Sequence, residues 1–254
     1  MSADKEKIDK VVRLIAEGRA MGIPILSPDI NESGIDFSVV YANPEGDAKL
    51  GKNTRVRDKL APRIRFGLGA VRGMGESAIA AILEARQSGA FRDLFDFAAR
   101  IDAKRLNKSV LEALIHSGAA DTILAGVSVS RASAVASSER VLERAKAASK
   151  DRMAGQADMF GLFATAGAKS STALSGDRYV DAPPWDSREL LALERKALGF
   201  YLSGHPLDRY GHLPVLTVEK ASEQEERSEF RLACTIEGYR ERHMKRGSAK
   251  MAFF

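Results

Sequence analysis

The stretch FGLGAVRGMGESAIAAILEAR, Phe66 to Arg86, places two closely spaced glycines, Gly73 and Gly75, directly before an apolar helical pattern. Glycine adopts positive φ angles easily and leaves the backbone uncovered. The N–H groups of such a turn, with those that open the following helix, can form a concave site of positive potential. A phosphate fits such a site, and Arg72 stands beside it. The stretch therefore predicts a site that holds a phosphate through the backbone and reads no base sequence.

A second helix–turn–helix pattern, FDFAARIDAKRLNKSVLEALIHSGA, follows at residues 95–119, with basic residues in its turn in place of paired glycines. Asn107 is suited to cap the second helix of this unit, and Gly118 is suited to end it. The two units resemble the helix–hairpin–helix motif, in tandem over residues 67–120. The residues then expected to bind DNA are Gly67, Gly69, Arg72, Gly73, Met74, Gly75, Lys104, Arg105 and Lys108. The alternative is a small helical bundle in which the glycines only permit close packing.

The composition limits the other classes of function. The 254 residues carry a net charge of +5, which weakly favours an acidic partner. The sequence contains no run of roughly 18 apolar residues and begins with the charged MSADKEKIDK, so we expect a cytoplasmic protein without a membrane partner. The single cysteine, Cys234, excludes an internal disulfide and is expected to be a small buried hydrophobe in a strand. The histidines are scattered, so no metal site is expected.

The chain outside the hairpins predicts a mainly α fold with minor β structure. Helical spacing covers residues 5–20, and Asp186 and Gly199 are suited to begin and end another helix. A short strand is expected at IDFSVVY, residues 35–41, and another at RIRFGLGAV, which changes character at its glycines.

Less regular secondary structure is expected from about residue 121 onward. RASAVASSERVLERAKAASK, residues 131–150, is compatible with one alanine-rich helix, and ATAGAKSSTALSG, residues 164–176, is typical of a linker. Near the end, EFRLACTIEGY (229–239) and KMAFF (250–254) are expected to be strands, with the basic RERHMKRGSA as the turn between them.

Several segments together carry a resemblance to a known family. These are RAMGIPILSPDIN, FGLGAVRGMGE, FDFAARIDAKRLNKSVLEALIHSGAAD, GQADMFG and LGFYLSGHPLDRY. They occur in the order and at about the spacing seen in bacterial replicative DNA polymerases of the C family. The chain resembles the C-terminal-side portion of such a polymerase over nearly all of its length.

The resemblance implies a layout and partners. Residues 1–66 would be the end of the fingers region, 67–120 the tandem hairpin domain that grips duplex DNA, 121–183 a helix and flexible linker, and 184–254 the lead-in helix and first strands of a truncated OB-fold barrel. The OB region could touch single-stranded template DNA. A bacterial cytoplasmic, nucleoid-associated protein is expected.

The linker cluster AGQADMFGLFATAG, residues 154–167, holds large apolar residues without a helix or strand pattern to carry them. Within the resemblance, Q-A-D-M-F is similar to the peptide by which bacterial polymerases dock on the sliding clamp. Gln156 would bond in one small pocket, Met159 and Phe160 would fill an apolar one, and Asp158 completes the set. The alternative is that these apolar residues fold back onto the helices.

The resemblance also implies that the polymerase active site lies outside this sequence. The polymerase aspartates, with two Mg²⁺ ions, belong to a palm region upstream, so no catalytic residue and no cofactor are expected here. Two other hypotheses stay open: a stand-alone helix–hairpin–helix module for repair or recombination, and a nuclease that uses a carboxylate cluster.

Overall fold

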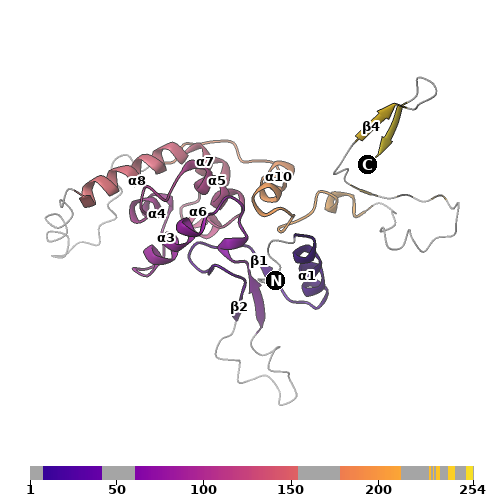
Figure 1. Ribbon diagram of the computed structural model, residues 1–254, viewed down its shortest axis with the longest axis horizontal. Helices are drawn as coiled ribbons and strands as arrows, with labels where there is room; N and C mark the ends of the chain where they lie inside the picture. Colours follow the sequence, from indigo (N-terminus) through magenta and orange to yellow (C-terminus); the bar gives the residue numbers. More distant parts are fainter. Residues whose placement is uncertain are drawn as a thin grey trace, which may run out of the picture. The chain divides into compact units, whose positions relative to one another are not determined.

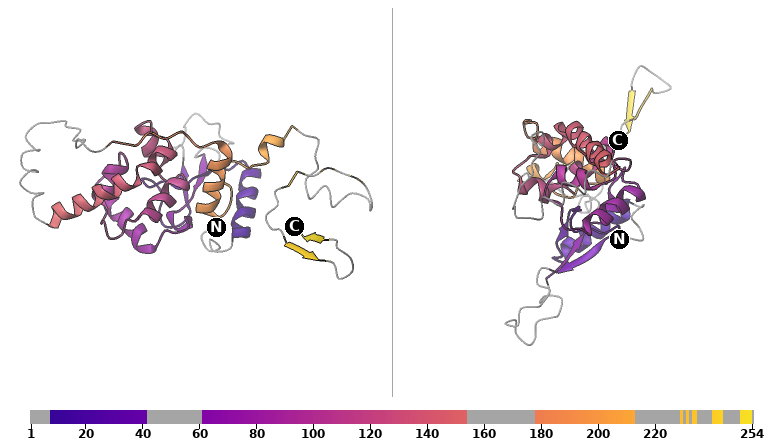
Figure 2. Two further views of the ribbon diagram at one scale, coloured as in Figure 1. Left: turned by 90° about the horizontal axis from the view of Figure 1, so that it is seen from above. Right: turned by 90° about the vertical axis from the view of Figure 1, so that its left-hand side faces the viewer.

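The computed structural model is mainly helical with a few short strands, and it divides into two compact units, residues 1–203 and 204–254 (Figures 1 and 2). The residues that the structure describes are 8–41, 61–153, 178–212 and, toward the C-terminus, Glu229, Arg231, 233–234, 240–243 and 250–253. Within these ranges no helix is both long enough and apolar enough to span a bilayer.

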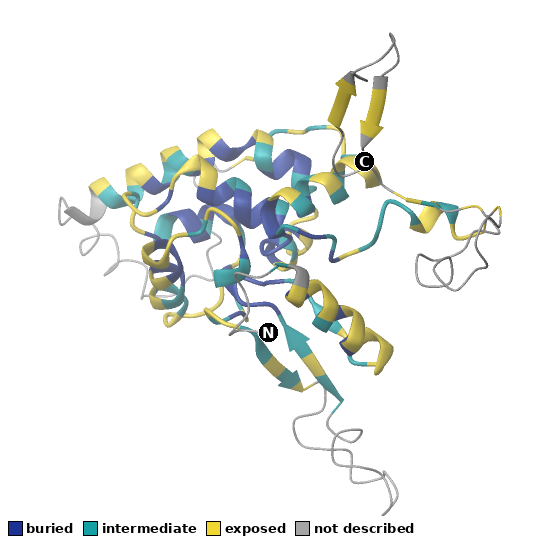
Figure 3. Cartoon of the chain, turned by 45° about the vertical axis from the view of Figure 1, so that its right-hand side comes forward, coloured by how far each residue is buried: buried dark blue, intermediate teal, exposed yellow. Residues whose placement is uncertain are grey.

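A run of consecutive helices in the first unit surrounds the larger of two apolar cores. In chain order they are α3 (Glu76–Arg86), α4 (Leu94–Arg100), α5 (Lys108–His116), α6 (Asp121–Gly126), α7 (Arg131–Ala136) and α8 (Ser138–Met153). In α3 the buried residues recur at helical spacing, as the amphipathic pattern predicts. Figure 3 shows that buried residues gather on the inner faces of these helices, while the outer face of α8 is exposed.

Residues 121–153 hold more order than the sequence predicts. Ile123, Leu124, Ala134 and Val141 are all buried in the same core as the hairpin helices. The expectation of one helix over residues 131–150 is wrong, because the chain breaks between α7 and α8 at Ser137. The Ser137 hydroxyl donates to the Ser133 carbonyl at 2.7 Å and accepts the Val180 N–H at 2.8 Å. That side chain therefore serves the tertiary structure as well as the helix end, which periodicity cannot reveal.

A three-stranded sheet precedes the hairpins, with β3 (Pro62–Arg65) in the middle. β1 (Ile25–Leu26) pairs with it in parallel, and β2 (Ser38–Tyr41) pairs with it antiparallel, with Val39 opposite Ile64. The predicted strands near residues 35–41 and 63–66 are thus present. β3 leads directly into the buried Phe66 and the first hairpin.

A second, smaller core lies beneath the first hairpin. Helix α1 (Ile8–Ala20) contributes Val11 and Ile15, and α10 (Ser187–Leu198) contributes Leu198. They pack against Phe66 and Val71 together with Phe200 and Leu202. The two helices lie side by side in both Figure 1 and Figure 2, although they are far apart in the sequence.

The caps of α10 confirm the predicted bounds. The Asp186 side chain accepts the Glu189 N–H at 2.7 Å, and Gly199 closes the helix in the left-handed region at φ 93°. The Gly199 N–H donates to the Arg195 carbonyl at 2.7 Å, as expected for a glycine at this position.

The loop before β2 joins the sheet to the hairpin helices. Asn31 makes a reciprocal pair with Phe91: its Nδ2 donates to the Phe91 carbonyl at 2.9 Å, and its Oδ1 accepts the Phe91 N–H at 2.7 Å. The Ile30 N–H donates to the Ala119 carbonyl at 2.9 Å, and Arg86 donates to the Ile30 carbonyl at 3.0 Å. The segment GIPILSPDIN therefore carries β1 and then the start of a loop that is hydrogen-bonded to the hairpin helices.

In the second unit, η3 (Asp208–Tyr210) is followed by an antiparallel pair, β4 (Arg240–His243) and β5 (Lys250–Phe253). β5 lies where the KMAFF strand was predicted. β4 occupies the start of the segment that was predicted to be the basic turn, and the described residues of 229–239 are not in a strand. The prediction that Cys234 is buried is also wrong, since the thiol is exposed. The alternation in EFRLACTIEGY alone could not fix the register of the hairpin. The OB-fold barrel stays a prediction.

Candidate nucleic-acid interface

The first hairpin turn brings its two glycines to the surface just before α3. Gly73 adopts φ 83°, the left-handed region that favours glycine, while Gly75 is the N-cap residue of α3 with an ordinary extended conformation, φ −77° and ψ 154°. A Cβ placed on Gly75 would meet nothing within 4 Å. Gly73 is therefore needed for the shape of the turn, whereas Gly75 is required by neither packing nor conformation.

Several amide donors of this turn are unused. The N–H groups of Gly73, Gly75, Glu76 and Ser77 donate to no other residue in the part of the chain that the structure describes, and no side chain caps α3. Gly75, Glu76 and Ser77 are exposed. A helix start with open donors and the positive end of the helix dipole favours an anion. The start of α3 therefore has the open amide donors that a phosphate site requires, and phosphate binding there stays a prediction.

Two glycines of the predicted set have a packing role. A Cβ on Gly67 would lie 2.3 Å from the Ile35 carbonyl oxygen, and one on Gly69 would lie 2.8 Å from the same atom. The Gly69 N–H donates to that carbonyl at 2.9 Å. These glycines let the short η2 turn (Leu68–Ala70) lie directly against the Ile35–Asp36 backbone. Their part in DNA binding stays a prediction, and the contacts supply a different reason for glycine.

Met74 and Arg72 flank Gly73, and they differ in burial. Met74 is half-buried and packs against both cores, so it anchors the turn. Arg72 is exposed, and its backbone N–H donates to the Ala197 carbonyl at the end of α10, at 2.7 Å. The turn is thus held from below, while the arginine side chain is available at the surface.

The second hairpin turn, between α4 and α5, is closed by its own side chains. The Asn107 carboxamide accepts the Val110 N–H at 2.9 Å, which confirms the predicted cap. The Asp102 carboxylate accepts the Lys104 N–H at 3.0 Å. Lys104, Arg105 and Lys108 are exposed. This turn offers positive side chains to a phosphate, where the first turn offers backbone amides.

The tips of the two hairpins adjoin. A Cβ placed on Gly73 would lie 3.8 Å from the Ser109 hydroxyl, in the first turn of α5. The exposed Lys108 precedes Ser109, and neither residue's N–H donates to another described residue. The open ends of α3 and α5 therefore share one surface. Sequence reasoning missed Ser109, because no pattern in the chain signals which tips meet.

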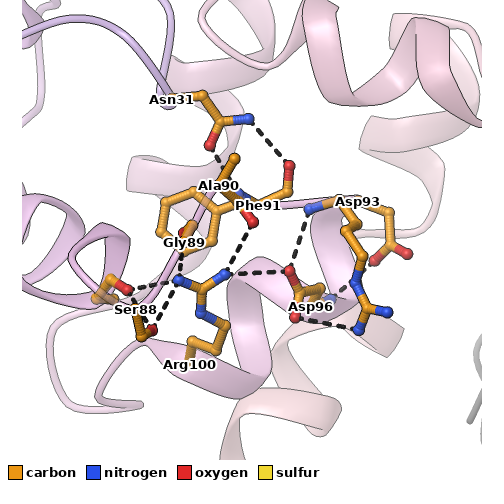
Figure 4. Close-up of polar contacts among 10 residues, drawn as sticks. Asn31, Ser88, Gly89, Ala90, Phe91, Asp93, Asp96 and Arg100 are labelled. Atoms are coloured by element: carbon orange, nitrogen blue, oxygen red, sulfur yellow. Dashed lines mark hydrogen bonds and ion pairs between the residues drawn. The ribbon is translucent and has the colours of Figure 1, made fainter. Parts of the chain in front are cut away.

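Arg100 lies close in the sequence to Lys104, Arg105 and Lys108, yet its guanidinium is used internally (Figure 4). It donates to the carbonyls that end α3 and lead into α4: Ala85 at 2.5 Å, Gly89 at 2.6 Å and Ala90 at 3.1 Å. It also pairs with Asp96 at 3.3 Å and lies 4.4 Å from the centre of the Phe91 ring. Arg100 is therefore a structural cation, separate from the exposed basic residues.

A groove of about 660 Å³ lies beside the second turn, lined by α3, the turn and α8. Its charges are mixed, with Arg100, Lys104 and Arg105 facing Glu84 and Asp102. The groove extends the exposed surface of the second hairpin, and it carries both positive and negative side chains.

Comparison with known proteins relates this pair of hairpins to a family of DNA polymerase subunits. A family model described as helix-hairpin-helix motif matches residues 22–134. DNA polymerase III subunit alpha of Pseudomonas fluorescens is 39% identical over 83% of the chain, and that of Escherichia coli strain K12 is also 39% identical over 83%. That of Neisseria meningitidis is 35% identical over 100% of the chain. The chain is homologous to one segment of the DNA polymerase III alpha subunits. It spans 16 to 19% of the length of these relatives.

The homology extends beyond the hairpins. The family model ends at residue 134, whereas the match to the Neisseria alpha subunit covers the whole chain. The alpha-subunit relationship therefore includes α8 and α10, which a shared hairpin motif alone would not explain.

The clamp-binding residues predicted for an alpha subunit, Gln156, Asp158, Met159 and Phe160, lie outside the described residues. The chain on their C-terminal side is fixed: the Tyr179 hydroxyl accepts the Leu94 N–H at 3.1 Å, and its ring packs on Phe95 with centroids 5.0 Å apart. Across the described ranges, no group of three or more His, Cys, Asp or Glu side chains is placed to hold a metal ion.

Proposed function

We propose that this chain is the part of a replicative DNA polymerase alpha subunit that grips duplex DNA through the tandem hairpins, with little dependence on base sequence. The single observation that carries the proposal is the open start of α3, where the amides of Gly73, Gly75, Glu76 and Ser77 donate to no described residue, beside the tip of the second hairpin. Phosphate oxygens are the acceptors of duplex DNA that backbone amides and helix N-termini meet without reading bases.

The exposed basic residues supply the second part of the grip. Lys104, Arg105 and Lys108 stand on the turn and first residues of α5. Each phosphate they neutralise releases condensed counterions, so affinity falls steeply with salt. The proposed interface thus combines backbone amide donors from the first hairpin with positively charged side chains from the second.

Binding of the chain to two duplexes of unrelated sequence, measured by fluorescence anisotropy at rising salt, tests the proposal. We expect similar affinity for both duplexes and a linear fall of log K with log salt. A folded chain that binds neither duplex, or whose binding ignores salt, would contradict it. A strong preference for one sequence would favour base readout instead.

We further propose that Gln156, Asp158, Met159 and Phe160 tether the polymerase to its sliding clamp. The support is the composition of QADMF and the homology to alpha subunits. A few apolar anchors can dominate such an interface. Replacing Gln156, Met159 and Phe160 together by alanine should abolish binding to the clamp and leave duplex binding unchanged. If the variant lost clamp binding and duplex binding together, these residues would be part of the packed core rather than a clamp-binding peptide.

Template-directed synthesis with Mg²⁺, a palm active site, and single-stranded DNA at an OB region are proposals for the whole alpha subunit that this chain would belong to. The rival, a stand-alone repair or recombination module, is disfavoured because relatives match the chain well past its hairpins. Magnesium-dependent cleavage of DNA by the purified chain would instead indicate a nuclease.

A further inference from the structure

The first hairpin turn is attached to the end of α10. The Arg72 N–H donates to the Ala197 carbonyl at 2.7 Å, so one of the last carbonyls of α10 accepts a bond from the turn. Val71 and Leu198 are buried in the same small core. The position of the turn therefore depends on a helix that is far away in the sequence.

The Arg72 guanidinium lies against the residue that ends this helix. A Cβ placed on Gly199 would come within 2.6 Å of Arg72 Nη2, 2.8 Å of Arg72 Cζ and 2.9 Å of Ile8 Cδ1, distances that real Cβ atoms do not adopt. The C-terminal end of a helix carries a partial negative charge, which favours a cation at this place. The absence of a side chain on Gly199 thus leaves the space that the Arg72 guanidinium occupies, and a Cβ at this position would take up that space.

The chain after Gly199 is itself firmly held. Glu194, 1% exposed, uses Oε1 to accept the Leu202 N–H at 2.5 Å and the Ser203 N–H at 2.8 Å. Arg19 of α1 donates to the Leu202 carbonyl. The space for the guanidinium is therefore bounded by fixed backbone, which cannot move aside easily when a side chain is added at position 199.

We propose that Gly199 is a positioning residue for DNA binding: by lacking a side chain, it seats the Arg72 guanidinium over the end of α10, next to the amide site of the first hairpin. The inference rests on the proposed duplex binding through that hairpin. It gives the glycine of the LGFYLSGHPLD segment a role in the DNA-binding surface, in addition to its role as a helix C-cap.

Gly118 offers a matched control. It also follows a helix, α5, with φ 81°, and a Cβ on it would lie 2.5 Å from Arg131 Nη2. That arginine pairs with Asp121 and donates to the His116 carbonyl at 3.3 Å, at the opposite end of α5 from Lys108 and Ser109. Gly118→Ala and Gly199→Ala therefore place a Cβ in the same left-handed conformation and against an arginine, with Asp121 as a further neighbour in the first and Ile8 in the second. Only the second should reach the DNA site.

The experiment measures duplex affinity of the chain against salt for four variants, Gly199→Ala, Gly118→Ala, Arg72→Ala and the double variant Gly199→Ala/Arg72→Ala. We expect Gly199→Ala to weaken binding several-fold and to lower the salt slope by about one, as Arg72→Ala does, because one phosphate contact is lost. The double variant should bind no more weakly than Arg72→Ala, since both changes remove one contact. Gly118→Ala should bind like the unaltered chain.

The inference is overturned if Arg72→Ala weakens binding while Gly199→Ala does not, if the two effects add in the double variant, or if Gly118→Ala weakens binding equally. Wild-type levels of binding by Arg72→Ala would also overturn it while leaving the hairpin proposal intact. Failure of the hairpin proposal shows differently, as absent or salt-insensitive binding by the unaltered chain. Should Gly199→Ala not fold, Gly199→Asn brings the same Cβ with a residue that tolerates the left-handed region.

Discussion

The two hairpin turns begin their helices in opposite ways. Helix α3 starts at Gly75, with no side chain over its first amides, whereas α5 starts at Asn107, whose carboxamide accepts the Val110 N–H. The second turn is further closed by Asp102, which accepts the Lys104 N–H. The second turn thus satisfies the Val110 and Lys104 amides with its own side chains, whereas no described side chain accepts from the first amides of α3.

The difference shows that the open turn is not a requirement of the fold. Asparagine would fit at position 75, since φ and ψ there suit an N-cap residue and nothing lies within 4 Å of an added Cβ. Such a cap stabilises a helix by about 0.5–2 kcal/mol over alanine and by a few tenths over glycine. The chain forgoes this stability where a phosphate would sit, which fits a binding site better than the bundle interpretation does.

The largest effect on duplex affinity is expected from Gly75→Asp, which gives the first turn a cap of its own. An aspartate there would occupy the amides and repel phosphate, so duplex affinity should fall by tenfold or more, about 1.4 kcal/mol or above. The melting temperature should stay level or rise, because aspartate is a good N-cap. Anisotropy titrations and thermal melts of the same samples measure both quantities.

Gly75→Asn separates the two causes of the loss expected for Gly75→Asp, which are occupation of the amides and charge repulsion of the phosphate. It supplies a neutral cap, so a smaller loss of affinity than with aspartate would assign the remainder to charge. Unchanged affinity in both variants would show that the first turn does not hold phosphate.

The next effect concerns the basic residues of the second hairpin. Arg100→Ala removes a guanidinium bonded to the Ala85, Gly89 and Ala90 carbonyls, so the free energy of unfolding should fall by about 2 kcal/mol. The salt slope of DNA binding should not change. Lys104→Ala, an exposed neighbour, should do the reverse, with stability unchanged and the slope reduced by about one. Identical behaviour of the two variants would remove the distinction between structural and binding cations.

The sequence predicted the hairpins well because their signals are local. Paired glycines before an apolar period, Asn107 as a cap and Gly118 and Gly199 as helix ends each depend on a few neighbouring residues, and the structure has them in these roles. The proximity of Gly73 to Ser109 and of the Arg72 guanidinium to Gly199 depends on tertiary packing, which periodicity does not encode. For the same reason Arg100 could not be told from Lys104 by charge alone.

A smaller effect is expected from opening the second turn. Asn107→Ala removes the cap of α5 and should lower the free energy of unfolding by about 1 kcal/mol. Duplex affinity should change less than twofold, because the second hairpin contributes through side-chain charge. Urea denaturation and the same titrations measure the two effects. A large loss of affinity in a stable variant would make the second helix start a phosphate site in its own right.

The smallest effect is on the pH dependence of stability, through His116 at the end of α5. Burial lowers the pKa of His116 below 6.5; among nearby charges, Glu112 opposes this lowering, while Lys196 and Arg131 add to it. The ring also packs beside Trp185, with centroids 5.5 Å apart. Because the folded chain prefers the neutral imidazole, the stabilisation is complete above pH 6.5 and is lost as the pH falls through the lower folded value. Urea unfolding at about pH 8 and about pH 5 should show a drop that His116→Gln reduces and that the exposed His212→Gln leaves in place. An equal drop in the His116→Gln variant would assign the pH dependence to other groups, and the second hairpin would then owe none of its stability to a neutral imidazole.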